Sequence, residues 1–452
     1  MRSARQGTLM ANQEQCGSRI SSVRLRAAKI LLRLIVALLS GFIASPSAQA
    51  QFKTLYTFTG GADGGRPDAR VITDAKGILY GTTFWGGNLT CNSGNGCGVI
   101  YMLTKTGKEA VLHRFAGGKD GAYPSAALIM DTQGNLYGTT TAGGSTSGCN
   151  GSGCGTVFRI DTTHKETVLH RFTGGKDGGE PSSALIVDKA GNFYGTTLGG
   201  GDVSCNAPYG CGVVYKLTAT GKETVLHTFT GSDGEDPDVD SLAIDTTGNF
   251  YGTTSHGGDP TCACGVVFKL TTTGKETVLH TFKGGTTDGS YPLSGVTLDT
   301  KDNLYGTAAL GGENNAGVLF KISNVSDVDP PANNFAMLYA FGNGASDGKQ
   351  PVGGVIVCSD GKDFGSTESG GSLFYGTLWL YDELKKKETV LYNFDYSFGG
   401  AVPLATDTWT GVRDGAEFYG VASEGGNVNG KNGSGVVHSE TYIHEDTLCT
   451  QH

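Results

Sequence analysis

One short motif, Tyr-Gly-Thr-Thr, recurs along the chain at nearly constant spacing and constrains the possible fold more than any other feature. Four copies are complete, and Tyr305-Gly306-Thr307 and Tyr419-Gly420 are weaker ones. The sixth copy along the chain is altered to Phe364-Gly365-Ser366-Thr367 and is followed by the same Gly-Gly pair as the others. The seven central glycines are Gly81, Gly138, Gly195, Gly252, Gly306, Gly365 and Gly420. The intervals between them are 57, 57, 57, 54, 59 and 55 residues. This regularity identifies a repeat architecture of seven units.

Each unit contains four short runs that are rich in β-branched and aromatic residues. In the second unit these runs cover residues 126–131, 135–140, 156–160 and 166–172, and turn residues separate them. Four strands in a unit of this length are typical of a propeller blade. The sequence therefore predicts an all-β fold, a seven-bladed β-propeller with four antiparallel strands in each blade.

The two ends of the repeat region are out of register with the units. A lone fourth-strand sequence, residues 54–58, precedes the first unit, and the last unit stops after its third strand, residues 435–440. The first strand can therefore complete the last blade, which leaves no open edge in the ring. An open solenoid would instead need polar caps at both ends. We expect residues 51–452 to form one closed propeller.

The first 50 residues differ in composition from the repeats. Five basic residues between positions 19 and 33 precede the apolar run 34–44, and the small-residue sequence Ala48-Gln49-Ala50 follows it. This order is typical of a secretory signal peptide, here cleaved after Ala50. The apolar run is short for a membrane span, and an uncleaved anchor is the alternative. We expect a secreted, periplasmic or extracellular protein with no membrane span after cleavage.

The charge of the repeat region excludes one class of partner. Removal of residues 1–50 takes away seven basic residues and one acidic residue, which leaves a net charge of −15. A surface this acidic repels phosphate backbones, so we expect no nucleic-acid partner.

The order of motifs within each unit resembles a known bacterial family. The segment L-Y-x-F-x-G-G-x-D-G-x-x-P precedes G-N-L-Y-G-T-T, a Gly-Gly pair and G-V-V-F-K-L, and the resemblance covers residues 52–440. On these motifs the chain resembles the GloVer (Gloeo/Verruco) tandem-repeat proteins, exported proteins with interchangeable C-terminal anchors. The resemblance implies export but no particular activity. Residues 447–452 lack the apolar tail of the anchored members.

Cysteines occur in pairs between the second and third strands of four successive units. The pairs are Cys91 with Cys97, Cys149 with Cys154, Cys205 with Cys211, and Cys262 with Cys264. In an exported chain this pattern predicts disulfides, although the ring closed by the last pair would be strained. Zinc is the alternative, but the loops supply no repeated histidine. Cys358 and Cys449 either pair with each other or stay free.

The long connections indicate where a ligand would bind. If the first strand of each blade is innermost, the connections between blades and between the second and third strands lie on one face. We call it the long-loop face and expect binding there, because the tight turns of the opposite face leave little room for a pocket. Two tip positions between Thr-Thr and Gly-Gly vary from unit to unit. Our candidate binding residues are the tips Phe84, Trp85, His256 and Glu424, and neutral loop drift is the alternative for each.

An Asp-Gly-x-x-Pro motif stands in the connection before the first six units. It is either a ring of carboxylates for a cation or sugar, or an Asx-type turn, and its recurrence in each blade favours the turn. One copy is richer in acidic residues, with five carboxylates in eight residues. Its aspartates, a candidate Ca²⁺ site with a solvated acidic loop as the alternative, are Asp233, Asp236, Asp238 and Asp240.

The histidines of the fourth strands do not indicate catalysis. Four of them share a position that tyrosine fills in the other units, which is typical of packing with a polar tip. The chain also lacks the common hydrolase, zinc-protease and phosphate-loop motifs. We therefore predict a non-catalytic extracellular binding or scaffold propeller whose ligand is a glycan or a protein. The alternatives are a propeller enzyme of lactonase or lyase type with a metal at the channel mouth, and a structural protein of the cell envelope.

Overall fold

The computed structural model describes residues 51–145, 149–237, 241–325, 334–397, 400–403, 408–409, 416–428, 431–442 and 449–450. The helical elements among them are three short 3-10 turns, η1 (Asn92–Gly94), η2 (Gly118–Asp120) and η3 (Cys149–Gly151). None of the helices in this described part is long and apolar enough to cross a membrane. The predicted signal peptide, residues 1–50, lies outside the described residues and stays a prediction.

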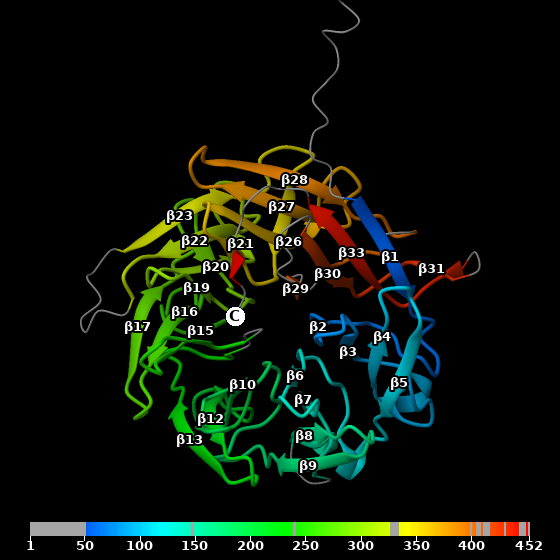
Figure 1. Ribbon diagram of the computed structural model, residues 1–452. Helices are drawn as coiled ribbons and strands as arrows, with labels where there is room; N and C mark the ends of the chain where they lie inside the picture. The colour runs from blue at the N-terminus through cyan, green and yellow to red at the C-terminus, as the bar shows by residue number, and fades with distance from the viewer. Residues whose placement is uncertain are drawn as a thin grey trace, which may run out of the picture. The chain divides into compact units, whose positions relative to one another are not determined.

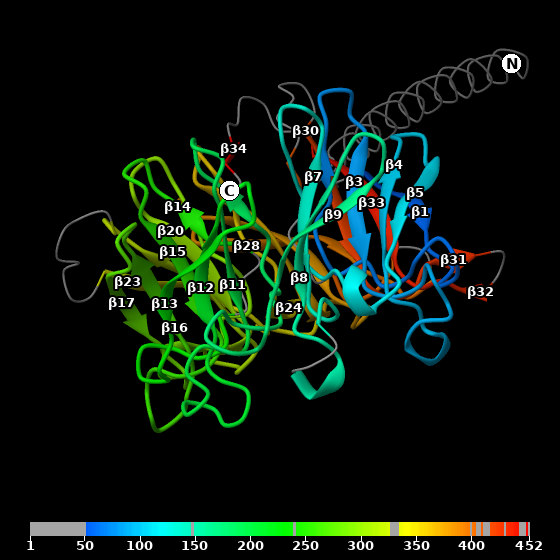
Figure 2. The ribbon, with the colours of Figure 1, turned by 90° about the horizontal axis from the view of Figure 1, so that it is seen from below.

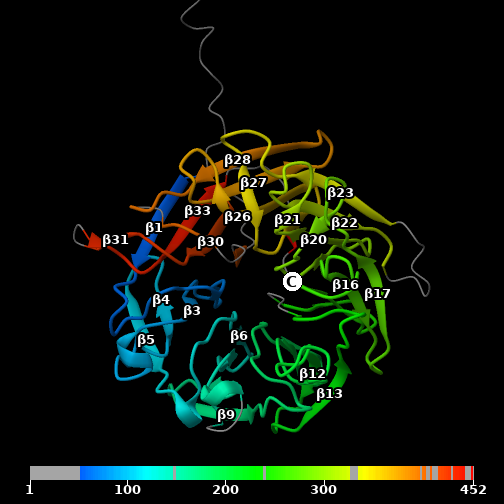
Figure 3. The ribbon, with the colours of Figure 1, turned by 180° about the vertical axis from the view of Figure 1, so that it is seen from behind.

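The strands form seven four-stranded antiparallel sheets around a common axis, one sheet for each unit (Figures 1 and 3). Within each blade the strands pair in the order in which we give them, and the first lies nearest the axis (Figure 1). Blades 1 and 2 consist of β2 (Ile72–Thr73), β3 (Leu79–Thr83), β4 (Val99–Leu103) and β5 (Glu109–Arg114), then β6 (Ile129–Met130), β7 (Leu136–Thr140), β8 (Thr156–Ile160) and β9 (Glu166–Arg171). Blades 3 and 4 consist of β10 (Ile186–Val187), β11 (Phe193–Thr197), β12 (Val213–Leu217) and β13 (Glu223–Thr228), then β14 (Ala243–Ile244), β15 (Phe250–Thr254), β16 (Val266–Leu270) and β17 (Glu276–Thr281).

The last three blades keep the same plan with small additions. Blades 5 to 7 consist of β19 (Thr297–Leu298), β20 (Leu304–Ala308), β22 (Val318–Ile322) and β23 (Phe335–Ala340), then β25 (Ile356–Cys358), β26 (Lys362–Gly370), β27 (Thr377–Asp382) and β28 (Lys387–Asn393), then β29 (Thr408–Trp409), β30 (Ala416–Ala422), β33 (Val436–Tyr442) and β1 (Gln51–Thr57). The additional strands are β18 (Gly289–Ser290), β21 (Leu310–Gly311), β24 (Gly348–Pro351), β31 (Asn427–Val428), β32 (Lys431–Asn432) and β34 (Cys449–Thr450). Figure 2 shows the blades from the side, with the β31–β32 hairpin at the right-hand edge. The prediction of an all-β, seven-bladed propeller is confirmed.

The first strand closes the ring. β1 pairs antiparallel with β33, from Gln51 opposite Thr441 to Thr57 opposite Val436. Phe58, directly after β1, is fully buried and packs in one cluster with residues of the first and last blades. The N-terminal strand therefore completes the last blade, as the out-of-register ends of the repeat region predict.

The repeated motif is explained by packing inside each blade. An aromatic side chain of the third strand lies across the central glycine, so a Cβ on Gly138 would lie 2.7 Å from the Phe158 ring. The two threonines bond in different directions. The first reaches the next blade, since Thr82 Oγ1 donates to the Ala126 carbonyl at 3.3 Å, and the second accepts the Val99 N–H at 3.3 Å through its own Oγ1. Glycine recurs because a side chain at that position would collide with the aromatic ring, and threonine recurs because its hydroxyl forms these hydrogen bonds.

Neighbouring blades meet through one repeated contact, which we call the blade seam. The glycine before each third strand touches the proline ring of the next blade, and a Cβ at that glycine would lie 2.3–2.9 Å from the proline Cδ. The pairs are Gly98–Pro124, Gly155–Pro181, Gly212–Pro237, Gly265–Pro292, Gly317–Pro351, Gly376–Pro403 and Gly435–Pro67. The last pair joins the final blade to the first, so ring closure uses the same contact as the other six seams.

Candidate functional site

The residue before each seam proline has a left-handed backbone. These seven residues have φ between +53° and +61°, a region that non-glycine residues seldom adopt: Arg66, Tyr123, Glu180, Asp236, Tyr291, Gln350 and Val402. The seam accounts for this conformation, because the N–H of each residue donates to a carbonyl of the preceding blade at 2.6–3.3 Å. The fold therefore fixes the backbone at these seven positions, while the side chains differ in charge, size and polarity.

The variable tips lie beside these pre-proline residues. In six blades the first tip residue donates its backbone N–H to the pre-proline carbonyl, as Phe84 does to Arg66 at 2.8 Å and Ser255 does to Asp236 at 3.0 Å. Because the two sets are bonded together on the long-loop face, we treat them as one surface, the rim. The rim comprises the pre-proline residues and the tips Phe84, Trp85, Thr141, Ala142, Leu198, Gly199, Ser255, His256, Ala309, Leu310, Glu368, Ser369, Ser423 and Glu424.

One part of the rim is aromatic. The rings of Phe84 and Tyr123, from blades 1 and 2, stack with centroids 4.9 Å apart. The Arg66 guanidinium lies 5.0 Å from the Phe84 ring and 5.2 Å from the Trp85 ring. Trp85 is 40 % exposed, so its indole presents apolar surface to solvent rather than to the core. We call these four residues the aromatic sector.

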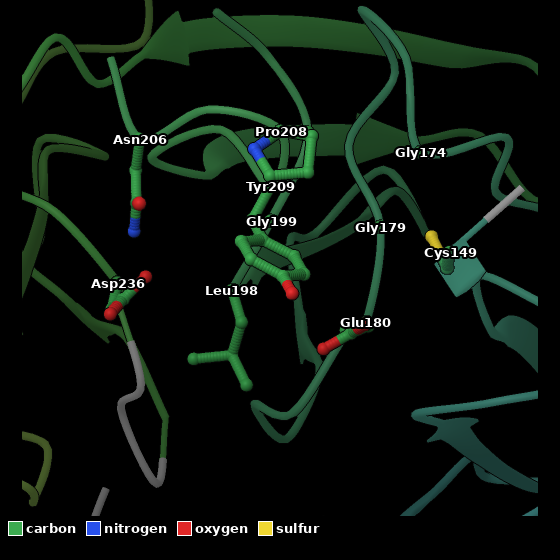
Figure 4. A pocket seen from close by; sticks show the side chains of 11 residues that line it. Cys149, Gly174, Gly179, Glu180, Leu198, Gly199, Asn206, Pro208, Tyr209 and Asp236 are labelled. Carbon is green, nitrogen blue, oxygen red and sulfur yellow. The ribbon is translucent and has the colours of Figure 1, made fainter. Parts of the chain in front are cut away.

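Another part of the rim is acidic and surrounds a cavity. Glu180 of blade 3 and Asp236 of blade 4 line a cavity of about 450 Å³ together with Leu198, Asn206 and Tyr209 (Figure 4). Burial raises the pKa of Glu180, and the nearby Asp236 carboxylate raises it further. The same two causes raise the pKa of Glu235, which accepts a hydrogen bond from the Asn206 amide. We call Glu180 and Asp236, together with Glu235, which precedes Asp236 and lies outside the rim itself, the acidic sector.

His256 contacts one carboxylate of the acidic sector. Its Nδ1 lies 3.3 Å from Asp236 Oδ2, and its ring packs edge-on against Tyr291 of blade 5. The hydrogen bond to Asp236 raises the pKa of His256. The imidazole is therefore an ion-pair partner of a rim carboxylate.

The four candidate binding residues from the sequence all lie on the rim but do not converge on one point. Phe84 and Trp85 belong to the aromatic sector, whereas His256 adjoins the acidic sector. Glu424 is exposed on blade 7, and its charge raises the pKa values of Asp68 and Glu368, for which burial is the larger cause. Sequence reasoning named one pre-proline residue, Asp236, but as a candidate Ca²⁺ ligand, and it missed the other six. The sequence did contain a signal for them, because the residue before the repeated proline differs from unit to unit while the proline itself is the same in all seven.

The predicted Ca²⁺ ligands have different partners. Asp233 accepts the Thr230 N–H at 2.8 Å and pairs with His227, whereas Asp236 pairs with His256. Asp238 and Asp240 lie outside the described residues, so a Ca²⁺ site in this loop stays a prediction. In the described part of the chain, the group of potential metal ligands found within 4.8 Å of one another comprises His113, Asp120 and Glu166.

The Asp-Gly-x-x-Pro aspartates hold turns, as their recurrence favours. Asp177 accepts the Thr173 N–H at 3.0 Å and lies 3.5 Å from His170 Nε2. Two tyrosines that replace histidine bond the equivalent aspartate through their hydroxyls, Tyr56 to Asp63 at 3.0 Å and Tyr339 to Asp347 at 2.9 Å. Histidine and tyrosine interchange here because each can donate to the same carboxylate.

These aspartates also meet the fourth strand of the next blade. Five fourth strands have a glutamate as their first or second residue, and it faces the preceding His–Asp or Tyr–Asp pair: Glu109, Glu166, Glu223, Glu276 and Glu388. Burial, with a neighbouring aspartate, raises the pKa of Glu166 to about 7 and that of Glu388 to about 8. In the other two fourth strands a phenylalanine stands in place of the glutamate. Its ring stacks on the aromatic residue of the preceding blade, Phe335 on His280 and Phe52 on Tyr392.

The structure contains the four predicted disulfides, with Cα separations of 5.7, 5.2, 5.8 and 5.1 Å in chain order. They brace the long loops, since the carbonyl of Cys154 accepts the seam hydrogen bond from Glu180. Cys358 is also disulfide-bonded, and its backbone pairs with that of Cys449.

The expectation that the tight-turn face leaves little room for a pocket is wrong. A cavity of about 720 Å³ lies there between blades 5 and 6, lined by residues that include Tyr305, Lys321 and Glu383. Another, of about 680 Å³, lies between blades 1 and 2. Both occupy the space between the turns of neighbouring blades, which the length of a single turn does not reveal.

Comparison with known proteins supports the repeat and the fold. A family model described as the Gloeobacter/Verrucomicrobia repeat matches residues 40–207 and 201–437. No curated protein matches the chain. The extracellular domain of a hybrid two-component system from B. thetaiotaomicron is 12 % identical with a TM-score of 0.50, and the match covers 88 % of this chain but only 43 % of that one. Oligogalacturonate lyase from Vibrio parahaemolyticus is 9 % identical with a TM-score of 0.49, over 87 % of this chain and 97 % of that one.

Proposed function

The chain belongs to the Gloeobacter/Verrucomicrobia repeat family, and from the geometry of its rim we propose that it is a non-catalytic extracellular module that binds a glycan on the long-loop face. One observation carries the proposal. Seven pre-proline positions have the same backbone conformation and the same seam hydrogen bond, yet their side chains range from arginine to valine. A rigid scaffold that presents varied side chains on one face suits recognition, because preorganised groups lose little entropy on binding.

The side chains of the rim favour a glycan. Sugars present apolar C–H faces beside hydroxyl groups, so their sites combine aromatic rings with hydrogen-bonding groups. The rim has the exposed Trp85 with Phe84 and Tyr123 on blades 1 and 2, and carboxylates on blades 3, 4, 6 and 7. A protein ligand is the second candidate, because the same aromatic and arginine residues are common binding hot spots.

The remaining functions have less support. A lactonase or lyase with a metal would need ligands gathered at the channel mouth, and the compact group His113, Asp120 and Glu166 instead involves the outermost strands β5 and β9. A purely structural envelope protein would not need side chains that vary at fixed backbone positions.

A glycan array probed with and without EDTA tests the proposal, followed by titration of the best glycan against Trp85→Ala. We expect EDTA-independent binding that the variant weakens about 30-fold, equivalent to about 2 kcal/mol, with little change in melting temperature. The matched control is Leu384→Ala, which removes an 86 % exposed side chain from the tight-turn face and should leave affinity unchanged. Array binding to no glycan would sink the proposal, as would a Trp85→Ala variant that melts early but binds normally.

A further inference from the structure

We propose that the cavity between blades 3 and 4 is a subsite for a protonated amino sugar. The inference rests on the proposed function, because it assigns one residue of the glycan that the rim would hold. The cavity, about 450 Å³, is within the size range of small-molecule sites. Figure 4 shows Tyr209 and Leu198 between the carboxylates of Glu180 and Asp236.

The charge of this cavity calls for a cationic ligand. Glu180 and Glu235 are each partly buried, and the charge of Asp236 acts unfavourably on both. His256 Nδ1 lies 3.3 Å from Asp236 Oδ2, and its charge also favours the ionised form of Glu235, whereas burial and Asp236 both disfavour the ionised form of Glu180. Partly desolvated carboxylates of like charge are costly unless a cation approaches them. A protonated amine would supply that cation and donate up to three hydrogen bonds.

The shape of the cavity favours a sugar ring as the carrier of the amine. The Tyr209 side chain is 57 % exposed, and with Leu198 it gives the cavity an apolar wall against which a pyranose face can pack. A bare metal ion would make no use of that wall. Ca²⁺ would also seek six to eight oxygens, more than the Glu180 and Asp236 carboxylates that line the cavity provide.

The wall is held in place before any ligand arrives. The Cys205–Cys211 disulfide closes the loop that carries Tyr209, and the Gly200 N–H donates to the Tyr209 carbonyl at 2.7 Å. The Tyr209 N–H in turn donates to the Asn206 carbonyl at 2.6 Å. Such a loop loses little freedom on binding, which favours a subsite over a surface that merely carries negative charge.

The test is calorimetric titration with two probes, a hexamer of glucosamine and a hexamer of N-acetylglucosamine, at pH 6, where the free amine is protonated. We expect the glucosamine hexamer to bind at least tenfold more tightly. Glu180→Gln and Asp236→Asn should each weaken it at least tenfold, and Tyr209→Ala should weaken both hexamers. The matched control is Glu313→Gln, which makes the same charge change at an exposed loop residue outside the rim and should alter affinity less than twofold.

The outcomes separate the two proposals. Equal affinity for the two hexamers, or full glucosamine binding by folded Glu180→Gln, overturns the amino-sugar subsite. If neither hexamer binds while another glycan binds in a Trp85-dependent manner, the subsite is wrong and the proposed function stands. A lysine-rich peptide that binds more tightly than the glucosamine hexamer also overturns it. Melting curves for each variant exclude loss of fold as the cause of lost binding.

Discussion

At each blade seam both the backbone and the side chains repeat, whereas on the rim only the backbone repeats. The two regions share residues, because the pre-proline N–H that completes a seam belongs to a residue whose side chain lies on the rim. In the seam a glycine and a proline touch seven times without exception. On the rim the seven pre-proline side chains comprise two tyrosines and five other residue types. The contrast shows that ring closure constrains the main chain and leaves the adjoining side chains available for recognition.

The largest expected effect comes from adding a side chain to a seam. Gly435→Val would place a Cβ 2.4 Å from Pro67 Cδ at a residue with φ of +100°, where the ring closes. We expect a loss of about 4 kcal/mol or more in the free energy of unfolding, or failure to fold, measured by urea titration. The control is Gly94→Ala, with φ of +103° but no atom within 4 Å, which should cost only about 1 kcal/mol. Similar losses in both variants would contradict a special role for the seam.

Removal of one disulfide should have a smaller effect. The double variant Cys149→Ser, Cys154→Ser opens a loop of sequence separation 5 that supports the seam carbonyl of Cys154. We expect the free energy of unfolding to fall by about 2 kcal/mol, with the blade fold kept. Thermal unfolding followed by circular dichroism measures it. An unchanged midpoint would show that the backbone of this loop needs no covalent brace.

The buried glutamates of the fourth strands should make the free energy of unfolding depend on pH. Burial and Asp347 raise the pKa of Glu388 to about 8 from 4.5, so the folded state holds the proton more tightly than the unfolded state. This contribution to stability is complete below about pH 4.5 and is lost as the pH rises through about 8. Glu388→Gln should therefore be more stable than the wild type at pH 9, by about 1 kcal/mol after allowance for solvent screening. Urea unfolding at pH 5, 7 and 9 measures the difference, with Glu313→Gln as the exposed control. If the free energy of unfolding changes with pH equally in both variants, the prediction is wrong.

The smallest effect is expected on the rim. Val402 is a β-branched residue with φ of +60°, so Val402→Gly relieves backbone strain while it adds freedom to the unfolded chain. These effects oppose each other, and we expect the free energy of unfolding to change by less than about 0.5 kcal/mol. A loss above about 2 kcal/mol in the same urea titration would show that the Val402 side chain is part of the seam, which would break the distinction between the two regions.

Most of the fold was predictable because each blade repeats the same local requirements. Spacing of the central glycines gave seven units, and the lone strand before the first unit predicted the pairing of β1 with β33. The candidate site was only partly predictable. Trp85 and His256 vary within an invariant frame and were visible as candidates, whereas the left-handed backbone at Glu180 or Val402 has no local sequence signal apart from the proline that follows.

The sequence by itself determined the number of blades, the order of their strands, the closure of the ring and the cysteine pairs. These features depend on residues that recur once in every unit, so a single chain displays the rule seven times. Only the tertiary structure decided which variable side chains meet. Phe84 stacks on Tyr123, and Asp236 lines the same cavity as Glu180, because neighbouring blades bring together residues more than 35 positions apart. The seam hydrogen bonds fix the backbone from which these side chains project. The sequence of one repeat does not determine these contacts, because each contact involves side chains of two different units and depends on the angle between their sheets.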